Sequence, residues 1–418
     1  MSVSALWSFL SDAPTNFRRR MSGGAYRPEI DGLRFFAIAI VVVGHVAERA
    51  VRFFPSARDL AEGNAVADLF QRAGLGVYLF FAISGFIIAT QARKARVSPL
   101  SGKFLKSYYW RRMLRIEPPY IVLLICTWLA LVVTGYTPEG ANHFKGEPAS
   151  LTTSLLGSLV YMHGLIWGAY PRLFPPGWSL EVEVQFYILA PLLFWLWFRL
   201  TNDMARIVFG AGLLAASAFL SLTLPAKLGP VFVDMSILRF FAFFWLGMLL
   251  CDAQGWIAGK AALLPRLAQT WIGWGGLIVY LLIPNAGDDI LPGMALRAAM
   301  YASLVAMFVG AWAPQSGFRA FCATPWISLI GGACYSIYLV HMQTTQVIST
   351  LAAKLAPALG LAGVFALMIV QYAAIVTAGL VFYALIERTF MLPDWHRQAA
   401  ARLRALAPFR RPRPTAAE

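Results

Sequence analysis

The chain has 418 residues, of which 59% are hydrophobic and only 13% charged, and its formal net charge is +15. Soluble proteins carry about a quarter charged residues, so this composition excludes an ordinary soluble domain. Long apolar runs recur from end to end, and the mean hydropathy is +0.64. We therefore expect an all-α, polytopic bundle of transmembrane helices. The positive-inside rule explains most of the basic charge, so no nucleic-acid partner is expected.

Apolar segments predict ten membrane spans. They lie near residues 33–52, 75–92, 119–135, 180–198, 206–224, 235–251, 271–284, 295–312, 327–350 and 360–385. Lysine and arginine collect before the first span, between the second and third spans, and after the last. With ten spans these regions share one side, which predicts that both termini are cytoplasmic. Residues 151–166 could form an eleventh crossing, but the arginine-rich tail would then lie outside. We interpret them as a re-entrant or interfacial segment.

Three regions follow from this topology. Residues 1–25 are expected to form a cytoplasmic N-terminal segment, residues 26–392 the membrane domain, and residues 393–418 a basic cytoplasmic tail. The opposite loops contain acidic patches such as Asp288-Asp289. No cleavable signal peptide is expected, because no long apolar core precedes the arginines at 18–20. The four cysteines show no metal-ligand spacing, so no metal site is predicted.

The first predicted span carries two polar residues that are unusual inside a membrane, Arg34 and His45. A helix turns by 100° per residue, so these side chains lie within about 20° of one face and about 16 Å apart along the axis. They therefore form one stripe, with Arg34 at the cytoplasmic mouth. The alternative is a snorkelling arginine and a hydrogen-bonded core histidine.

An arginine cluster lies in YYWRRMLRIEPPY, residues 108–120, just before the third span. Arg111, Arg112 and Arg115 recur at helical spacing, and Pro118-Pro119 then predicts a break or redirection of the helix. A cytoplasmic group of guanidinium side chains suits bidentate phosphate binding. Anchoring to anionic lipid would explain the spacing equally well.

Two acids enter the fourth span in PPGWSLEVEVQFYILAPLLF, residues 175–194. Residues two apart point in different directions on a helix, so we expect at most one of Glu181 and Glu183 to face the bundle centre. A carboxylate at this depth could hydrogen-bond His45 and raise its basicity, as a general base requires. The alternative is a structural ion pair, for example with Arg239 in the sixth span.

Further polar residues occur in two spans. FFAISGF, residues 80–86, places Ser84 and Gly85 in the second span, where small residues usually serve close helix packing. GGACYSIYLVHMQ, residues 331–343, places Tyr335 and His341 in the ninth. These two residues could line a polar cavity, or His341 could be satisfied structurally.

In their order along the chain, these motifs resemble the acyltransferase-3 family of integral membrane acyltransferases, which acylate cell-envelope polysaccharides and some small molecules. The motifs are RPEIDGLRFFAIAIVVVGH (27–45), FFAISGF (80–86), RRMLRIEPPY (111–120), WSLEVEVQFY (178–187), RFFAFFWLGMLL (239–250), CYSIYLVH (334–341) and FYALIERTF (382–390). The likeness covers roughly residues 26–392, which makes this region a membrane acyltransferase domain. Many relatives also carry a C-terminal SGNH domain, which we expect this protein to lack.

The resemblance implies an acyl-coenzyme A donor, such as acetyl-CoA, on the cytoplasmic side and a hydroxyl acceptor on the outer side. The family's arginine and histidine correspond to Arg34 and His45, and its motif acid to Glu183. The family's arginine-rich motif corresponds to Arg111, Arg112 and Arg115. Glu181 stands where a small polar residue is common in the family.

We therefore expect a bacterial inner-membrane O-acyltransferase in which the arginines hold the coenzyme phosphates. His45, oriented by Glu183, would be the general base or would itself carry the acyl group transiently. Ser84, Tyr335 and His341 are candidate oxyanion donors, and Glu181 and Arg239 possible substrate contacts. That list completes the predicted site.

The expected acceptor is an envelope or exported glycan, with a small molecule such as a macrolide as the alternative. Membrane lipids are the other expected partners. A transporter of acyl groups or glycans, or a lipid-binding scaffold, would also use a polytopic bundle. A scaffold would leave the stripe of Arg34 and His45 without an explanation.

Overall fold

The computed structural model describes residues 12–18, 26–95, 98–136, 138, 150–284 and 290–391. Every regular element within these residues is helical. The predicted basic tail at 393–418, most of the predicted N-terminal segment 1–25, and Asp288-Asp289 lie outside the described residues.

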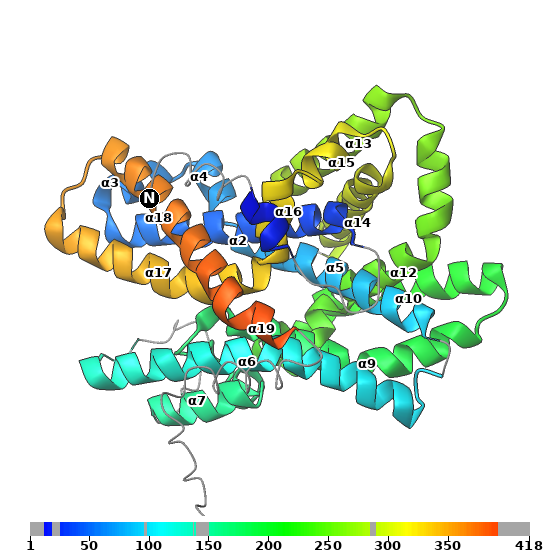
Figure 1. Ribbon diagram of the computed structural model, residues 1–418, viewed down its shortest axis with the longest axis horizontal. Helices are drawn as coiled ribbons and strands as arrows, with labels where there is room; N and C mark the ends of the chain where they lie inside the picture. The colour runs from blue at the N-terminus through cyan, green and yellow to red at the C-terminus, as the bar shows by residue number, and fades with distance from the viewer. Residues whose placement is uncertain are drawn as a thin grey trace, which may run out of the picture.

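Long helices form the body of the described chain (Figure 1). They are α2 (Pro28–Phe53), α5 (Ala73–Lys94), α6 (Gly102–Thr134), α9 (Trp178–Arg199), α10 (Asp203–Leu228), α12 (Ile237–Ala262), α13 (Arg266–Leu282), α14 (Ile290–Trp312), α17 (Cys334–Leu355) and α18 (Leu361–Phe382). They follow the predicted apolar segments in order. Within the described residues, eight helical stretches are long and apolar enough to cross a membrane, so the chain is a multi-pass membrane protein. The other two long helices are α13, which has 17 residues, and the polar α17.

Short helices connect the long ones. They are α3 (Pro55–Ala61), α4 (Ala65–Phe70), α7 (Leu151–Leu159), α8 (His163–Trp167), η1 (Pro175–Gly177), α11 (Pro230–Asp234), α15 (Gly317–Cys322), α16 (Pro325–Gly332), η2 (Tyr383–Glu387) and α19 (Arg388–Phe390). Helix α7 has nine residues and so extends about 14 Å, roughly half of the hydrocarbon thickness. Residues 151–166 therefore do not cross as one helix.

The break predicted at Pro118-Pro119 is wrong, because α6 continues through both prolines for 33 residues. Proline removes a backbone donor, and membrane helices tolerate this where a neighbouring helix supports the backbone. The Tyr335 hydroxyl of α17 donates a 2.8 Å hydrogen bond to the Ile116 carbonyl, just before the prolines. The arginine cluster and the third span are thus one rigid element.

The predicted ninth span, 327–350, is in fact two helices, since α16 ends at Gly332 and α17 begins at Cys334. The reason is a close backbone contact with α2. A Cβ added to Gly331 would lie 1.7 Å from the carbonyl oxygen of Asp31. Helix α16 therefore docks directly on the start of α2, and the chain turns before α17 sets out.

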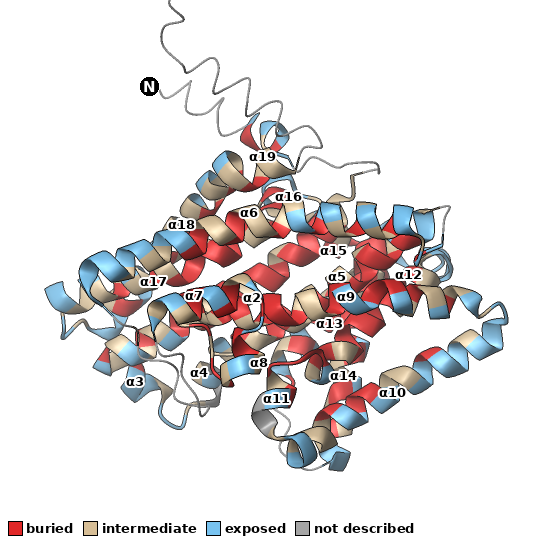
Figure 2. Cartoon of the chain, turned by 90° about the horizontal axis from the view of Figure 1, so that it is seen from below, coloured by how far each residue is buried: buried red, intermediate tan, exposed pale blue. Residues whose placement is uncertain are grey.

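The core of the bundle is formed by α2, α5 and α12, which Figure 2 shows largely buried. About 72% of the apolar stretch of α2 is buried, against 22% in α10, which therefore presents most of its surface to lipid. Helices α5 and α12 meet at glycines: a Cβ on Gly85 would lie 2.0 Å from the carbonyl oxygen of Phe244, and one on Gly247 equally close to that of Ala82. The packing role predicted for Gly85 is confirmed.

Candidate active site

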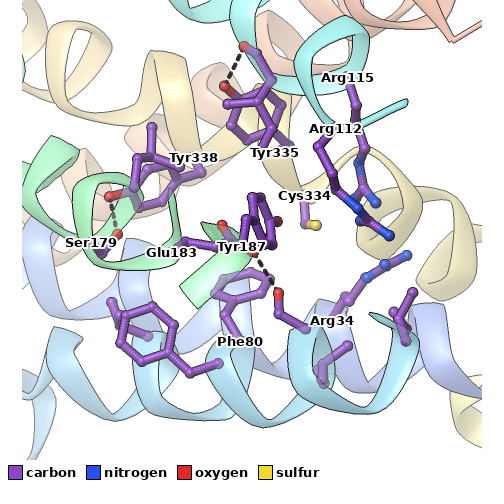
Figure 3. Close-up of a pocket in the computed structure, with 17 residues that line it drawn as sticks. Arg34, Phe80, Arg112, Arg115, Ser179, Glu183, Tyr187, Cys334, Tyr335 and Tyr338 are labelled. Carbon is purple, nitrogen blue, oxygen red and sulfur yellow. Dashed lines mark hydrogen bonds between the residues drawn. The ribbon is translucent and has the colours of Figure 1, made fainter. Parts of the chain in front are cut away.

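A pocket opens beside the N-terminal half of α2, between this helix and α5, α6, α9 and α17 (Figure 3). It contains about 740 Å³ of empty space, counting its open mouth. Six predicted site residues line it: Arg34, Ser84, Arg112, Arg115, Glu183 and Tyr335. The structure thus gathers side chains from five helices that are far apart in sequence.

Three guanidinium groups face one side of the pocket, as Figure 3 shows. Arg34 is buried and donates a 2.6 Å hydrogen bond to Asp31, one turn earlier on α2. Arg112 donates to Gln91, and Arg115 lies one turn further along α6. Asp31 and Gln91 hold two of the cations in place, so this side of the pocket is ready to bind an anion.

Arg111, the third arginine of the predicted cluster, does not line the pocket. Its side chain is exposed and donates to the Ser107 hydroxyl on its own helix. Arg112 is buried and lines the pocket together with Arg115, whereas Arg111 lies on the exposed flank of α6. The predicted cluster therefore separates into two pocket residues and one surface residue.

Glu183 lies in the middle of the pocket and accepts two hydrogen bonds of 2.5 Å, from Ser84 Oγ and from the Tyr187 hydroxyl. Tyr187 was not predicted, although it follows Glu183 by four residues on the same helix face. The predicted hydrogen bond between Glu183 and His45 is absent from the described contacts. Glu183 instead shapes the pocket wall that joins α5 and α9.

Two candidate oxyanion donors have their hydrogens already engaged. Ser84 donates to Glu183, and Tyr335 donates to the Ile116 carbonyl. Each hydroxyl has a single proton, so either would have to break a buried contact before it could stabilise an oxyanion. The guanidinium groups are the strongest donors left in the pocket.

Glu181 and Arg239 lie away from the pocket lining. Glu181 is 1% exposed and accepts a 2.8 Å hydrogen bond from the backbone of Gly164, so it secures α8. Arg239 lies 3.5 Å from Asp234 and donates to the Ser221 carbonyl. The predicted ion pair between Arg239 and one of the α9 acids is therefore wrong.

His163, for which the sequence indicated no role, anchors the segment that does not cross. Its imidazole is buried between Ser154 Oγ, 3.0 Å away, and the Ala169 carbonyl, 3.1 Å away. Burial lowers the pKa of His163 to about 4. The side chain is therefore neutral near pH 7, and its two hydrogen bonds connect Ser154 to the backbone at Ala169.

His45 lies on α2 about three turns beyond Arg34. Its Nδ1 is 2.8 Å from a carboxylate oxygen of Glu48, which is again on the same helix. The imidazole also stacks on that of His341 from α17, with ring centroids 5.3 Å apart. The structure therefore pairs the predicted base with Glu48 and a second histidine.

His341 is fully buried and its Nδ1 lies 2.5 Å from the Tyr338 carbonyl oxygen. A carbonyl only accepts, so this nitrogen carries the proton, and Nε2 of the neutral ring is an acceptor. That Nε2 is buried without a hydrogen-bond partner among the described residues. In both histidines Nδ1 is engaged, which leaves Nε2 as the nitrogen for proton transfer.

Tyr338 lies beside both the pocket and the histidine pair. It lines the pocket, and its ring centroid lies 5.5 Å from that of His341. Its hydroxyl bonds to the Pro176 carbonyl and to Ser179, and its ring packs against Phe174. Tyr338 therefore contacts both the pocket that holds the arginines and one ring of the histidine pair.

The chain is similar to known acyltransferases. A protein-family model described as an acyltransferase domain matches residues 27–388 of the chain. The chain is 28% identical to Nodulation protein 10 of Rhizobium leguminosarum bv. viciae, over 88% of this chain and 94% of that protein. It is 25% identical to Acyltransferase MdmB of Streptomyces mycarofaciens, over 76% and 79% of the two chains. Peptidoglycan O-acetyltransferase OatA of Listeria monocytogenes is 26% identical over 46% of this chain and 28% of its own. No solved structure gives a significant match.

Proposed function

Because the chain belongs to the acyltransferase-3 family of membrane acyltransferases, we propose that it transfers an acyl group from acyl-coenzyme A to a hydroxyl of a cell-envelope or exported glycan. The donor binds at the Arg34 end of α2 and the acceptor at the His45 end. The name of one relative, a peptidoglycan O-acetyltransferase, supports an acetyl group and a glycan acceptor.

The proposed sidedness rests on charge and on the number of long helices. Ten crossings place both termini in the cytoplasm of a bacterium, with the inner membrane as the host. The basic connection between α5 and α6 then lies on the same side as Arg34. Cytoplasmic acyl-coenzyme A therefore meets the arginines first, and the histidines lie toward the outer side.

The convergence of three guanidinium groups on one pocket is the observation that carries the proposal. Coenzyme A presents phosphates at one end and a thioester at the other. Arg34, Arg112 and Arg115 bind the phosphates through charge-assisted hydrogen bonds. The apolar lining, including Phe80 and Ile87, receives the uncharged arm.

His45 acts as the general base in this mechanism. Its Nε2 takes the proton from the acceptor hydroxyl while the hydroxyl oxygen attacks the thioester carbonyl. The C–S bond then breaks, and the proton passes from the imidazolium to the departing thiolate. Glu48 stabilises the imidazolium in between. The products are an ester and free coenzyme A.

The acyl group reaches His45 by passing Tyr338. A rotation of its ring away from Ser179 joins the pocket to the histidine pair. The His341 ring lies next to the Tyr338 ring. Neutral His341 has its only N–H engaged, so it donates to the oxyanion only after taking a proton at Nε2.

Two variants of the purified protein test the proposal. His45→Ala should bind coenzyme A normally and lose acyl transfer by about 10²-fold or more. Arg34→Ala should lose affinity for coenzyme A, as isothermal titration calorimetry can measure. Near-normal turnover of His45→Ala would show that the mechanism is wrong.

A covalent route is distinguished by exposing the protein to acyl-coenzyme A alone. Intact-mass spectrometry of the wild-type protein should then show no added acyl group at any time before acceptor is supplied. An acyl adduct that is absent from His45→Ala and disappears on addition of acceptor would establish an acyl-histidine intermediate instead.

A further inference from the structure

A second pair of arginines lies at the end of the bundle that carries His45. Arg239 precedes Phe243 by one turn on α12, and Arg297 precedes Tyr301 by one turn on α14. The rings of Phe243 and Tyr301 pack with centroids 5.3 Å apart. Residues four apart share a helix face, so both arginines project from the contact between these helices, one turn beyond the rings. They are close enough to interact electrostatically.

Arg297 is an unusual cation for this position. It is 9% exposed, and its Nε is buried without a hydrogen-bond partner among the described residues. The neutral hydroxyl of Tyr301, one turn later on α14, is the neighbour to which the guanidinium can hydrogen-bond. Within the described part of the chain Arg297 forms no ion pair. A buried cation in an apolar bundle is strongly destabilising unless an anion compensates it, so such residues mark binding sites.

The neighbouring pair of Arg239 and Asp234 is partly exposed. Their side chains are 33% and 34% exposed, and the 3.5 Å distance between them is long for an ion pair. Counting Arg239, Arg297 and Asp234, the cluster carries one net positive charge. It therefore combines two partly exposed charged side chains with a buried guanidinium group.

The cluster continues toward the proposed catalytic histidine. Tyr78 stacks on Phe243, with centroids 4.8 Å apart, and interacts with both arginines. Gly44, the residue before His45, packs against Ala73 of α5, and Tyr78 follows Ala73 by five residues on the same helix. The arginine cluster and His45 therefore lie at the same end of α5.

We propose that Arg297 and Arg239 form an oxyanion-binding site that holds a phosphate or carboxylate group next to His45. If the proposed function is correct, the anion belongs to the acceptor, and its binding places a hydroxyl at the base. The anion could come from a soluble acidic sugar or from a lipid headgroup. Guanidinium groups bind both through the same hydrogen bonds.

The test measures binding of inorganic phosphate to the purified full-length protein by the shift of its melting midpoint. The donor pocket is first saturated with coenzyme A, because its own arginines would otherwise bind phosphate. Arg297→Gln should weaken the apparent affinity for phosphate about 10-fold or more, as expected for a lost charge-assisted hydrogen bond. Arg266→Gln, at an exposed position at the start of α13, is the matched control and should leave it unchanged.

The lipid source is tested with nanodiscs of phosphatidylglycerol and of phosphatidylcholine. If a headgroup occupies the site, phosphatidylglycerol stabilises the wild-type protein more than Arg297→Gln. The inference is overturned if Arg297→Gln responds like the wild type to both phosphate and phosphatidylglycerol. If Arg297→Gln does not fold, Arg239→Gln is measured instead, since Arg239 is partly exposed. A response of Arg239→Gln to phosphate and phosphatidylglycerol that equals that of the wild type would also overturn the inference.

These measurements are independent of catalysis. Arg115→Gln should lose affinity for coenzyme A. Its phosphate response at Arg297 and Arg239, measured at coenzyme A concentrations that saturate this variant, should be unchanged. A failure of His45→Ala to lose transfer would remove the proposed mechanism and leave the anion site standing. A normal response of Arg297→Gln to both phosphate and phosphatidylglycerol would remove the anion site and leave the transfer mechanism standing.

Discussion

The pairing of His45 with Glu48 predicts different kinetic roles for Glu48 and Glu183, the two carboxylates near the site. Replacing Glu48 by glutamine keeps the size of the side chain and removes the charge that stabilises the imidazolium. A hydrogen bond to a charged group contributes about 1.5–3 kcal/mol. The Glu48 side chain is 43% exposed, so solvent screening reduces this to about 1–2 kcal/mol. At about 1.4 kcal/mol per factor of ten, kcat should fall about 5- to 30-fold.

The assay is steady-state acyl transfer by the purified protein, with the acyl-coenzyme A concentration varied. Glu48→Gln should lower kcat and leave KM for the donor nearly unchanged, because Glu48 lies away from the pocket lining. Glu183→Gln should show the reverse pattern, since Glu183 holds Ser84 and Tyr187 at the pocket wall. The reasoning fails if Glu48→Gln has normal kcat while Glu183→Gln loses it at constant KM.

Three further predictions follow from the described contacts. Arg115→Gln should raise KM for acyl-coenzyme A about 10-fold or more, whereas Arg111→Gln should change it less than about 3-fold, because only Arg115 lines the pocket. Burial lowers the pKa of His163 from 6.5 to about 4, so its contribution to stability is complete above pH 6.5 and is lost as the pH falls toward 4. The melting midpoint of the wild type should therefore fall more steeply over this range than that of His163→Gln, and parallel curves would contradict the assignment. Gly247→Ala should destabilise the bundle by about 1–3 kcal/mol, since its Cβ meets a carbonyl oxygen of α5 at 2.0 Å, whereas Gly255→Ala on the same helix meets nothing within 4 Å and should melt like the wild type.

The helices themselves were predictable, because each long apolar run must satisfy its backbone hydrogen bonds internally. Two exceptions depend on contacts between distant segments. Helix α6 continues through Pro118-Pro119 with Tyr335 as a neighbour, and the predicted ninth span divides where Gly331 meets Asp31. A single sequence contains no signal for either contact.

Those contacts of the site that join residues on the same helix were predictable. Asp31 lies three residues before Arg34, and Glu48 three residues after His45, so helical spacing alone indicates both pairs. The expected partner of His45 was instead Glu183, a carboxylate of another helix. Contacts such as His45 with His341 join residues about 300 positions apart, and only the packing of α2 on α17 brings them together.

The position of Tyr338 has a consequence for the membrane itself. A continuous polar path from the arginines to the histidines would let protons and ions leak across the bilayer and dissipate its electrochemical gradient. If the acyl group passes Tyr338 as proposed, the ring, whose hydroxyl is bonded to Pro176 and Ser179, would close this path at rest. If the Tyr338 ring moves aside only while an acyl chain takes its place, the bilayer stays electrically sealed throughout turnover.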